Sequence, residues 1–136
     1  MVIVIDDDGV MAGCVAKAVR EAGAEVRVFS DAIAAMNMIS EGVVPEMIFL
    51  DVMLTGPDGF TFLNELISYD DTAKIPVVIV TALDLTGKDL GSYGVVAVLE
   101  KEVMVPRDIR ELVEEYRDEV GASGIAETGV GNEIGA

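Results

Sequence analysis

The chain has 136 residues, and its 25 acidic against 9 basic residues give a formal net charge of −16 at pH 7. This length suits a single domain, and the charge disfavours direct binding to nucleic acid or to an anionic membrane surface. The sequence contains no histidine, which excludes histidine-based catalysis and histidine-ligated zinc or iron. No apolar run approaches the ~20 residues of a membrane span. We expect a cytoplasmic location without a signal peptide, because a strand-like run begins at Val2.

Strands are expected to alternate with helices along the first 120 residues. Continuous runs of apolar, mostly β-branched residues are typical of buried parallel strands. Four such runs are present, at residues 2–5, 47–50, 77–80 and 95–99. The alternating residues 25–29 predict a fifth strand at an edge of the sheet. Parallel strands joined by short helical crossovers form a three-layer α/β sandwich with right-handed connections.

Helices are expected where apolar residues recur at helical spacing, at residues 9–22, 31–42, 60–67 and 106–120. In the second of these helices, Ile33, Met36 and Ile39 are predicted to form the buried stripe. The first helix contains Cys14, the one cysteine, and its apolar neighbours predict that this side chain is packed. A single cysteine cannot form an internal disulfide.

Three segments fit the alternating pattern less well. Residues 69–72 are polar and predict a turn, and residues 83–94 are interrupted by glycines, so any helix there is short or frayed. Residues 121–136 are rich in small and polar residues without periodicity, which predicts a flexible tail or the start of a linker. The domain is therefore expected to span residues 1–120.

Each of the four apolar runs leads into a polar or charged group. Asp6 and Asp7 follow the first run, Asp51 the second and Thr81 the third, and Lys101 lies two residues after the fourth. Open α/β sheets bind ligands at the carboxyl ends of their strands, so these groups are expected to converge. Clustered carboxylates repel one another, and a bound divalent cation would relieve this repulsion. Because all of the candidate ligands are oxygen atoms, Mg²⁺ is the favoured cation. With a lysine and a hydroxyl nearby, the set suits phosphoryl transfer, in which an aspartate can be the nucleophile.

This order of residues resembles that of the response regulator receiver domains, the CheY-like family. The resemblance covers roughly residues 1–120. It rests on the acidic pair Asp6-Asp7, on Asp51, on Thr81-Ala82 and on Lys101. The resemblance implies a flavodoxin-like, doubly wound fold with a five-stranded parallel sheet and a role in two-component signalling.

The resemblance also implies a metal site and a phosphoacceptor. Asp51 would accept the phosphoryl group. Asp7 would be a direct Mg²⁺ ligand and Asp6 a ligand through water. The backbone carbonyl of Met53 would be a further metal ligand.

The remaining roles implied by the resemblance concern the phosphoryl group and the partners. Thr81 would bind a phosphoryl oxygen and move toward it, and Lys101 would pair with the phosphate. The donor would be a phosphohistidine of a sensor histidine kinase or phosphotransfer protein. The resemblance does not identify the output partner, and a homodimer is one assembly to test. The domain would have no enzymatic activity beyond its own phosphorylation and slow dephosphorylation.

The sequence departs from the family pattern at several positions. Glu102 replaces the proline that usually follows the lysine, so the cis peptide that normally aims Lys101 is not expected. Val98 stands where an aromatic switch residue is usual, which predicts an unusual readout. Met53 and Leu83 occupy positions that in this family influence the attack of water on the acyl phosphate. Both are apolar here, which predicts a shielded and long-lived aspartyl-phosphate.

Two other functions fit parts of the sequence. Asp6-Asp7-Asp8-Gly9 resembles the Asp-x-Asp-Gly start of haloacid-dehalogenase-like phosphatases, in which Asp6 would be the nucleophile. That interpretation gives Asp51 no role, and no acidic strand end follows Lys101. The other alternative is a receiver-like interaction module that no longer uses phosphate.

Overall fold

Five strands form one parallel sheet in the order β2-β1-β3-β4-β5. The computed structural model describes residues 1–53, 59–83, 85 and 89–128, with residues 118–128 as helical backbone alone. The strands are β1 (Val2–Ile5), β2 (Val26–Phe29), β3 (Met47–Leu50), β4 (Val77–Thr81) and β5 (Val95–Glu100). The fold class predicted from the sequence is therefore confirmed, and β2 is an edge strand as expected.

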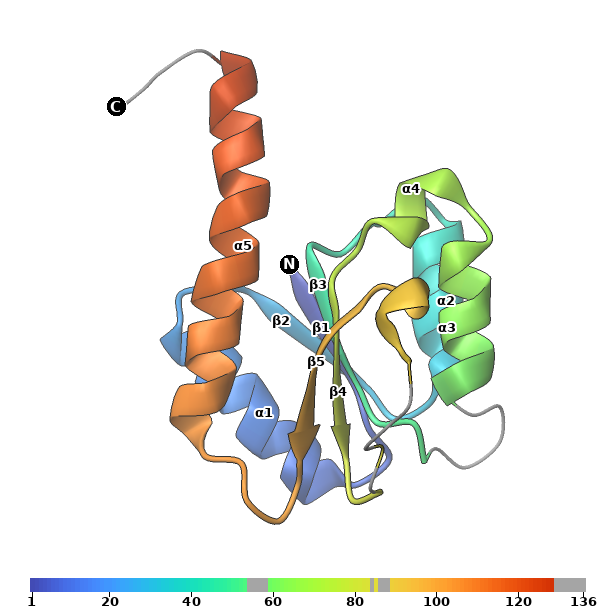
Figure 1. Ribbon diagram of the computed structural model, residues 1–136, viewed down its shortest axis with the longest axis vertical. Helices are drawn as coiled ribbons and strands as arrows, with labels where there is room; N and C mark the ends of the chain where they lie inside the picture. Colours follow the sequence, from blue (N-terminus) through green and yellow to red (C-terminus); the bar gives the residue numbers. More distant parts are fainter. Residues whose placement is uncertain (54–58, 84, 86–88, 129–136) are drawn as a thin grey trace.

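Helices cover both faces of this sheet (Figure 1). They are α1 (Gly9–Glu21), α2 (Ala32–Ser40), α3 (Gly59–Ile67), the short α4 (Asp70–Ala73) and α5 (Pro106–Thr128). One face carries α1 and α5, and the other carries α2 and α3. Alternate residues of a strand point to opposite faces, so each face has its own apolar core. Ile3 and Ile48 belong to the core under α2 and α3, whereas Val4 and Phe49 belong to the core under α1 and α5.

The turn from β1 into α1 is fixed by a helix cap. One carboxylate oxygen of Asp8 accepts hydrogen bonds from the backbone N–H groups of Val10 and Met11, both at 3.1 Å. These N–H groups have no partner within the helix, which is why an aspartate is favoured at this position. The cap holds the short segment that carries Asp6 and Asp7.

Two expectations about side-chain burial are wrong. α2 buries Ala32, Ala35, Met38 and Ile39. Ile33, which was expected inside, is 54% exposed. The four buried residues recur at helical spacing and form the inward stripe of α2, and Ile33 lies outside this stripe. Cys14 is also exposed, because α1 packs through the opposite face.

The segment between β4 and β5 has no α-helix in its described residues, only the 3₁₀ turn η1 (Gly91–Tyr93). This agrees with the poor helix predicted there, although residues 84 and 86–88 lie outside the described part. The polar turn expected at residues 69–72 is wrong, because most of it forms α4. The hydroxyl of Thr72 in α4 donates to the carbonyl oxygen of Leu66 in α3 and also lies 3.3 Å from that of Tyr69, which ties the two helices together.

α5 begins at Pro106, as predicted, because proline suits the first turn of a helix. It continues past residue 120 to Thr128, so the tail expected at residues 121–136 begins inside this helix. Residues 129–136 lie outside the described part, and the domain boundary at residue 120 stays a prediction. Within the described residues, no helix combines the length and the apolar character that crossing a bilayer requires.

Candidate functional site

The site lies where β1 and β3 end side by side. Residues 2–5 pair in register with residues 47–50, so Asp6 and Asp51 leave the sheet at the same level. The N–H of Asp51 donates to the Ile5 carbonyl at 2.9 Å, and the N–H of Asp6 donates to the Phe29 carbonyl at 3.0 Å. Backbone hydrogen bonds therefore fix the position of both aspartates.

Asp6, Asp7 and Asp51 form an acidic cluster. One carboxylate oxygen from each lies within 4.8 Å of the other two. Asp6 and Asp51 are only 3% and 4% exposed, whereas Asp7 is exposed. The cluster is therefore walled by protein on one side and open to solvent on the other.

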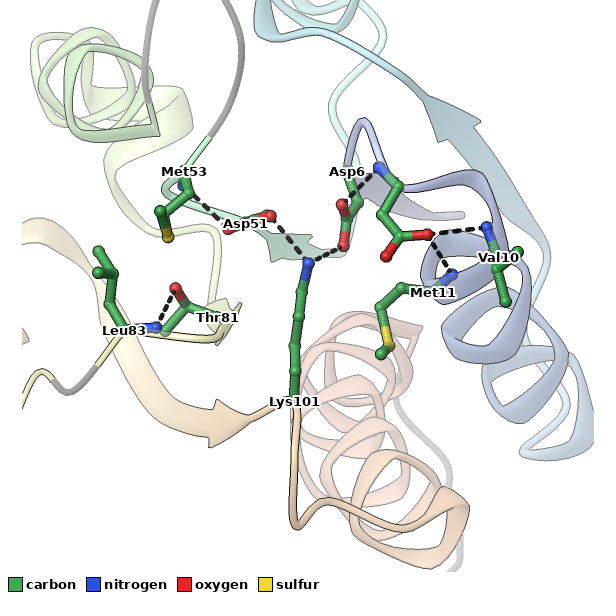
Figure 2. Close-up of polar contacts among 9 residues, drawn as sticks. Asp6, Val10, Met11, Asp51, Met53, Thr81, Leu83 and Lys101 are labelled. Atoms are coloured by element: carbon green, nitrogen blue, oxygen red, sulfur yellow. Dashed lines mark hydrogen bonds and ion pairs between the residues drawn. The ribbon is translucent and has the colours of Figure 1, made fainter.

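Lys101 reaches into this cluster and bridges its two buried members (Figure 2). Its Nζ lies 2.9 Å from Asp51 Oδ2 and 3.0 Å from Asp6 Oδ2. The backbone N–H of Lys101 donates to the Thr81 carbonyl at 3.0 Å, which holds the lysine beside the end of β4. No peptide bond among the described residues is cis. The ammonium thus reaches both carboxylates although Glu102 replaces the usual proline.

Burial and charge shift the pKa values of two of these groups. Burial raises the pKa of the Asp6 carboxyl, and the Asp8 N–H and the Lys101 ammonium offset this only in part. Burial also lowers the pKa of Lys101, but its hydrogen bonds to Asp51 and Asp6 outweigh that effect, and the pKa lies above its usual value. The lysine is therefore charged at neutral pH.

Backbone N–H groups orient the two buried carboxylates. Met53 donates to Asp51 Oδ1 and Asp8 donates to Asp6 Oδ1, each at 2.9 Å. Each carboxylate therefore has one oxygen held by the backbone and the other held by Lys101. A carboxylate offers about four lone-pair sites, so both aspartates keep acceptor capacity for a ligand.

Thr81 is fully buried at the end of β4. Its Oγ1 accepts a hydrogen bond from the Leu83 N–H at 3.1 Å, and a hydroxyl that accepts in this way still has its own hydrogen to donate. Figure 2 shows Met53 and Leu83 on the same side of the site as Thr81. Met53 is 52% and Leu83 39% exposed, so apolar side chains border the site there.

Gly59 is a positioning residue whose role the sequence did not reveal. A Cβ atom at this position would lie 2.5 Å from the Val52 Cα and 3.0 Å from the Asp51 carbonyl oxygen. Its N–H also donates to the Val52 carbonyl at 3.3 Å. The first residue of α3 therefore packs directly against the backbone that carries Asp51. Only the spacing from Asp51 to Gly59 hinted at this contact.

The composition of the cluster fits a hard divalent cation. All of its donors are carboxylate oxygens. Among the described residues three carboxylates face one ammonium, so that ammonium does not balance the negative charge when all three are ionised. Mg²⁺ typically takes one or two carboxylates and keeps several waters, and exposed Asp7 gives such a hydrated ion access. The residues present therefore fit Mg²⁺.

Together, fold and site define a doubly wound α/β domain whose acidic, lysine-bridged site lies where the strand order reverses. The chain belongs to the response regulator receiver domain family, and the family model matches residues 2–114. The resemblance noted in the sequence is thus confirmed, and the chain is a signalling domain of two-component response regulators.

Individual relatives agree with this assignment. The chain is 35% identical over 82 residues to the DNA-binding dual master transcriptional regulator RpaA of Synechocystis, which covers 60% of this chain and 34% of RpaA. It spans about a third or less of the length of the curated relatives that it matches.

Solved structures show the same fold. The receiver domain of NtrX from Brucella abortus superposes with a TM-score of 0.73 at 24% identity, over 85% of this chain and 97% of that one. The Mn²⁺-bound form of the response regulator Rcp1 superposes with a TM-score of 0.68 at 22% identity, over 85% and 91% of the two chains.

The family match and the geometry both weaken the phosphatase alternative. In an Asp-x-Asp motif, Asp8 would be the second working acid. Here its side chain caps α1 through Val10 and Met11. Asp51, which that alternative leaves without a role, instead lies in the acidic cluster beside Lys101.

Proposed function

We propose that Asp51 accepts a phosphoryl group from a phosphohistidine of a sensor histidine kinase or phosphotransfer protein. Asp6, Asp7, Asp51 and the backbone carbonyl of Met53 would hold the Mg²⁺ that this reaction needs. The observation that carries the proposal is the single ammonium of Lys101, 2.9 Å from Asp51 and 3.0 Å from Asp6. An acceptor carboxylate with a fixed cation beside it is what transfer of an anionic group requires.

In the proposed reaction an Asp51 carboxylate oxygen attacks phosphorus as the bond from phosphorus to the histidine nitrogen breaks. The electron pair of that bond returns to the imidazole of the donor. The Met53 N–H holds one oxygen of Asp51, which orients the carboxylate for attack. Bound Mg²⁺ would supply positive charge to the phosphoryl oxygens.

The product would be an aspartyl-phosphate whose oxygens face Lys101 and Thr81. Lys101 would exchange its contact with the Asp51 carboxylate for one with the phosphoryl group, because its Nζ already lies beside that residue. The hydroxyl hydrogen of Thr81 would turn toward a phosphoryl oxygen. That movement would change the strand end next to Leu83 and thereby the surface read by an output partner.

The proposal extends to the context of the domain. We propose that residues 1–120 form the functional unit, that it works in the cytoplasm, and that it has no enzymatic activity beyond phosphorylation and slow dephosphorylation of itself. The output partner and any homodimer are not specified by the site. In RpaA, the receiver region is part of a protein named for DNA binding, whereas the charge of −16 disfavours such binding by this domain.

Labelling with radioactive acetyl phosphate tests the proposal. Wild-type protein should acquire acid-stable, base-labile label with Mg²⁺ and none with EDTA. Asp51→Asn should abolish labelling, whereas Asp8→Asn should retain it, since asparagine also caps helices. Loss of label in Asp6→Asn but not in Asp51→Asn would favour the phosphatase alternative. Wild-type protein that takes no label would contradict the proposal and favour an interaction module.

A further inference from the structure

The seven methionines of the chain, all of which the structure describes, differ widely in their exposure to solvent. Met38 and Met47 are buried, at 6% and 0% exposed. Four others are half-buried: Met1, Met11, Met36 and Met104. Met53 is 52% exposed. Its thioether sulfur is therefore the methionine sulfur that a small solute reaches most easily from water.

This exposed methionine also lies next to the proposed phosphoacceptor. The backbone N–H of Met53 donates to Asp51 Oδ1 at 2.9 Å. Figure 2 shows its side chain on the same side of the site as Thr81 and Leu83. The side chain of Leu83 is a saturated hydrocarbon, which a mild oxidant leaves unchanged. Met53 is therefore the oxidisable member of the apolar pair that borders the site.

Oxidation would change the chemical character of this border. A lone pair of the thioether sulfur attacks one oxygen of hydrogen peroxide, and the O–O bond breaks. The oxygen bound to sulfur loses its proton, and the other oxygen leaves as water. Sulfur is oxidised by two electrons, and the peroxide is reduced by the same two. The product, methionine sulfoxide, is polar, and reductases convert it back to the thioether.

We propose that Met53 is a reversible oxidation site for hydrogen peroxide, and that its sulfoxide shortens the lifetime of the aspartyl-phosphate at Asp51. The effect on lifetime rests on the proposed function. A thioether is only a weak hydrogen-bond acceptor, so it gives little orientation to water near the acyl phosphate. A sulfoxide oxygen beside Asp51 accepts a hydrogen bond from water and orients that water for attack. Peroxide thereby shifts the domain toward its unphosphorylated state.

The first measurement tests the oxidation itself and needs no phosphate. All proteins carry Cys14→Ser, because the exposed thiol of Cys14 is also oxidisable. Folded protein is treated with hydrogen peroxide, and the gain of oxygen at each methionine is followed with time by mass spectrometry. Met53 should react before the other six, and about tenfold faster than buried Met47, since burial keeps peroxide from the sulfur. Oxidation of another methionine before Met53 would overturn the proposal.

The second measurement follows the loss of label from protein phosphorylated with radioactive acetyl phosphate and Mg²⁺, with and without earlier peroxide treatment. Oxidised protein should lose its label about three- to tenfold faster, and treatment with methionine sulfoxide reductase should restore the original rate. In Met53→Leu, peroxide should not change the rate of loss. Met11→Leu is the matched control: it removes the other methionine labelled in Figure 2, and peroxide should still accelerate its loss of label.

The outcomes separate this inference from the proposed function. An unchanged rate in protein oxidised at Met53 would overturn the inference, as would the same acceleration in Met53→Leu. Protein that takes no label before peroxide treatment would instead contradict the proposed function, and with it the effect on lifetime. The order in which the methionines are oxidised is measured on unphosphorylated protein and does not depend on that result.

Discussion

Replacing Lys101 with methionine should destabilise the domain by about 3 kcal/mol in the absence of divalent metal. Methionine keeps much of the length of the side chain but removes the ammonium that neutralises Asp6 and Asp51. These carboxylates are 3% and 4% exposed. They would then face each other without a cation, and Asp6 in particular is already costly to ionise because burial raises its pKa.

The magnitude follows from the geometry of the ion pairs. The ammonium contacts both carboxylates at 2.9 and 3.0 Å, and removal of one partner of a buried pair typically costs about 3–5 kcal/mol. The side chain of Lys101 is 14% exposed, so we expect the lower end of that range. For a domain of this size, the change corresponds to a fall in melting temperature of about 10 °C.

Urea denaturation followed by circular dichroism, with EDTA and then with Mg²⁺, measures this effect. Lys17→Met is the control, because it removes the same charge from the exposed face of α1 and should change stability by about 0.5 kcal/mol or less. With Mg²⁺ the deficit of Lys101→Met should shrink, since a bound cation stabilises the folded state and replaces the lost charge. If both variants unfold at the same urea concentration in EDTA, the lysine does not hold the acidic cluster together.

Three further predictions concern other parts of the domain. Gly59→Ala should lower the unfolding free energy by about 1–3 kcal/mol, because the added Cβ would lie 2.5 Å from the Val52 Cα. Gly13→Ala is the control in the same denaturation assay: its Cβ would meet no atom within 4 Å, and it should be neutral or stabilising. Burial raises the pKa of Glu46, but the amino group of Met1 and then Arg117 outweigh that effect, and the pKa lies below its usual value of 4.5. Glu46→Gln should therefore lower the unfolding free energy by about 0.5–1 kcal/mol at pH 7. This difference should disappear as the pH falls below 4.5 and through the lowered pKa of Glu46 in the folded state. A constant difference down to pH 3 would refute this assignment. Met53→Asn should shorten the lifetime of the aspartyl-phosphate severalfold, measured as loss of label with time, because a polar side chain in place of the exposed Met53 can orient water; equal lifetimes would contradict the shielding hypothesis.

The strands could be predicted from the sequence because buried parallel strands need apolar residues on both faces. β1 and β3 are buried at every position, and their bounds match the apolar runs. β4 and β5 each extend one residue further than predicted, to Thr81 and Glu100, because backbone pairing continues past the apolar residues.

Helix faces were harder to predict, because periodicity alone does not say which of two apolar stripes packs inward. In α2 the buried stripe contains Ala32 and Ala35, whereas Ile33 lies outside it. Cys14 was misplaced for a related reason: its neighbours in α1 are apolar, but its own position points to solvent. The extent of α5 beyond residue 120 had no signal, because glycines there argue against a helix.

For the site, the sequence placed five polar groups at strand ends but gave no distances. Register between β1 and β3 turns two separate aspartates into neighbours. The reach of Lys101 could not be judged from the sequence once proline was missing, because it depends on how the end of β5 bonds to Thr81. The contact of Gly59 with Val52 was equally hidden, since it joins two segments whose approach is set by the packing of α3. The catalytic and metal-binding roles of these residues stay predictions.

Locating the modified residue tests the central claim most directly. Wild-type protein is incubated with phosphoramidate and Mg²⁺, the acyl phosphate is reduced with borohydride, and peptides are sequenced by mass spectrometry. The proposed function predicts homoserine at position 51 and at no other aspartate, and no homoserine when EDTA replaces Mg²⁺. Homoserine at position 6, or none at all in folded protein with Mg²⁺, would contradict it.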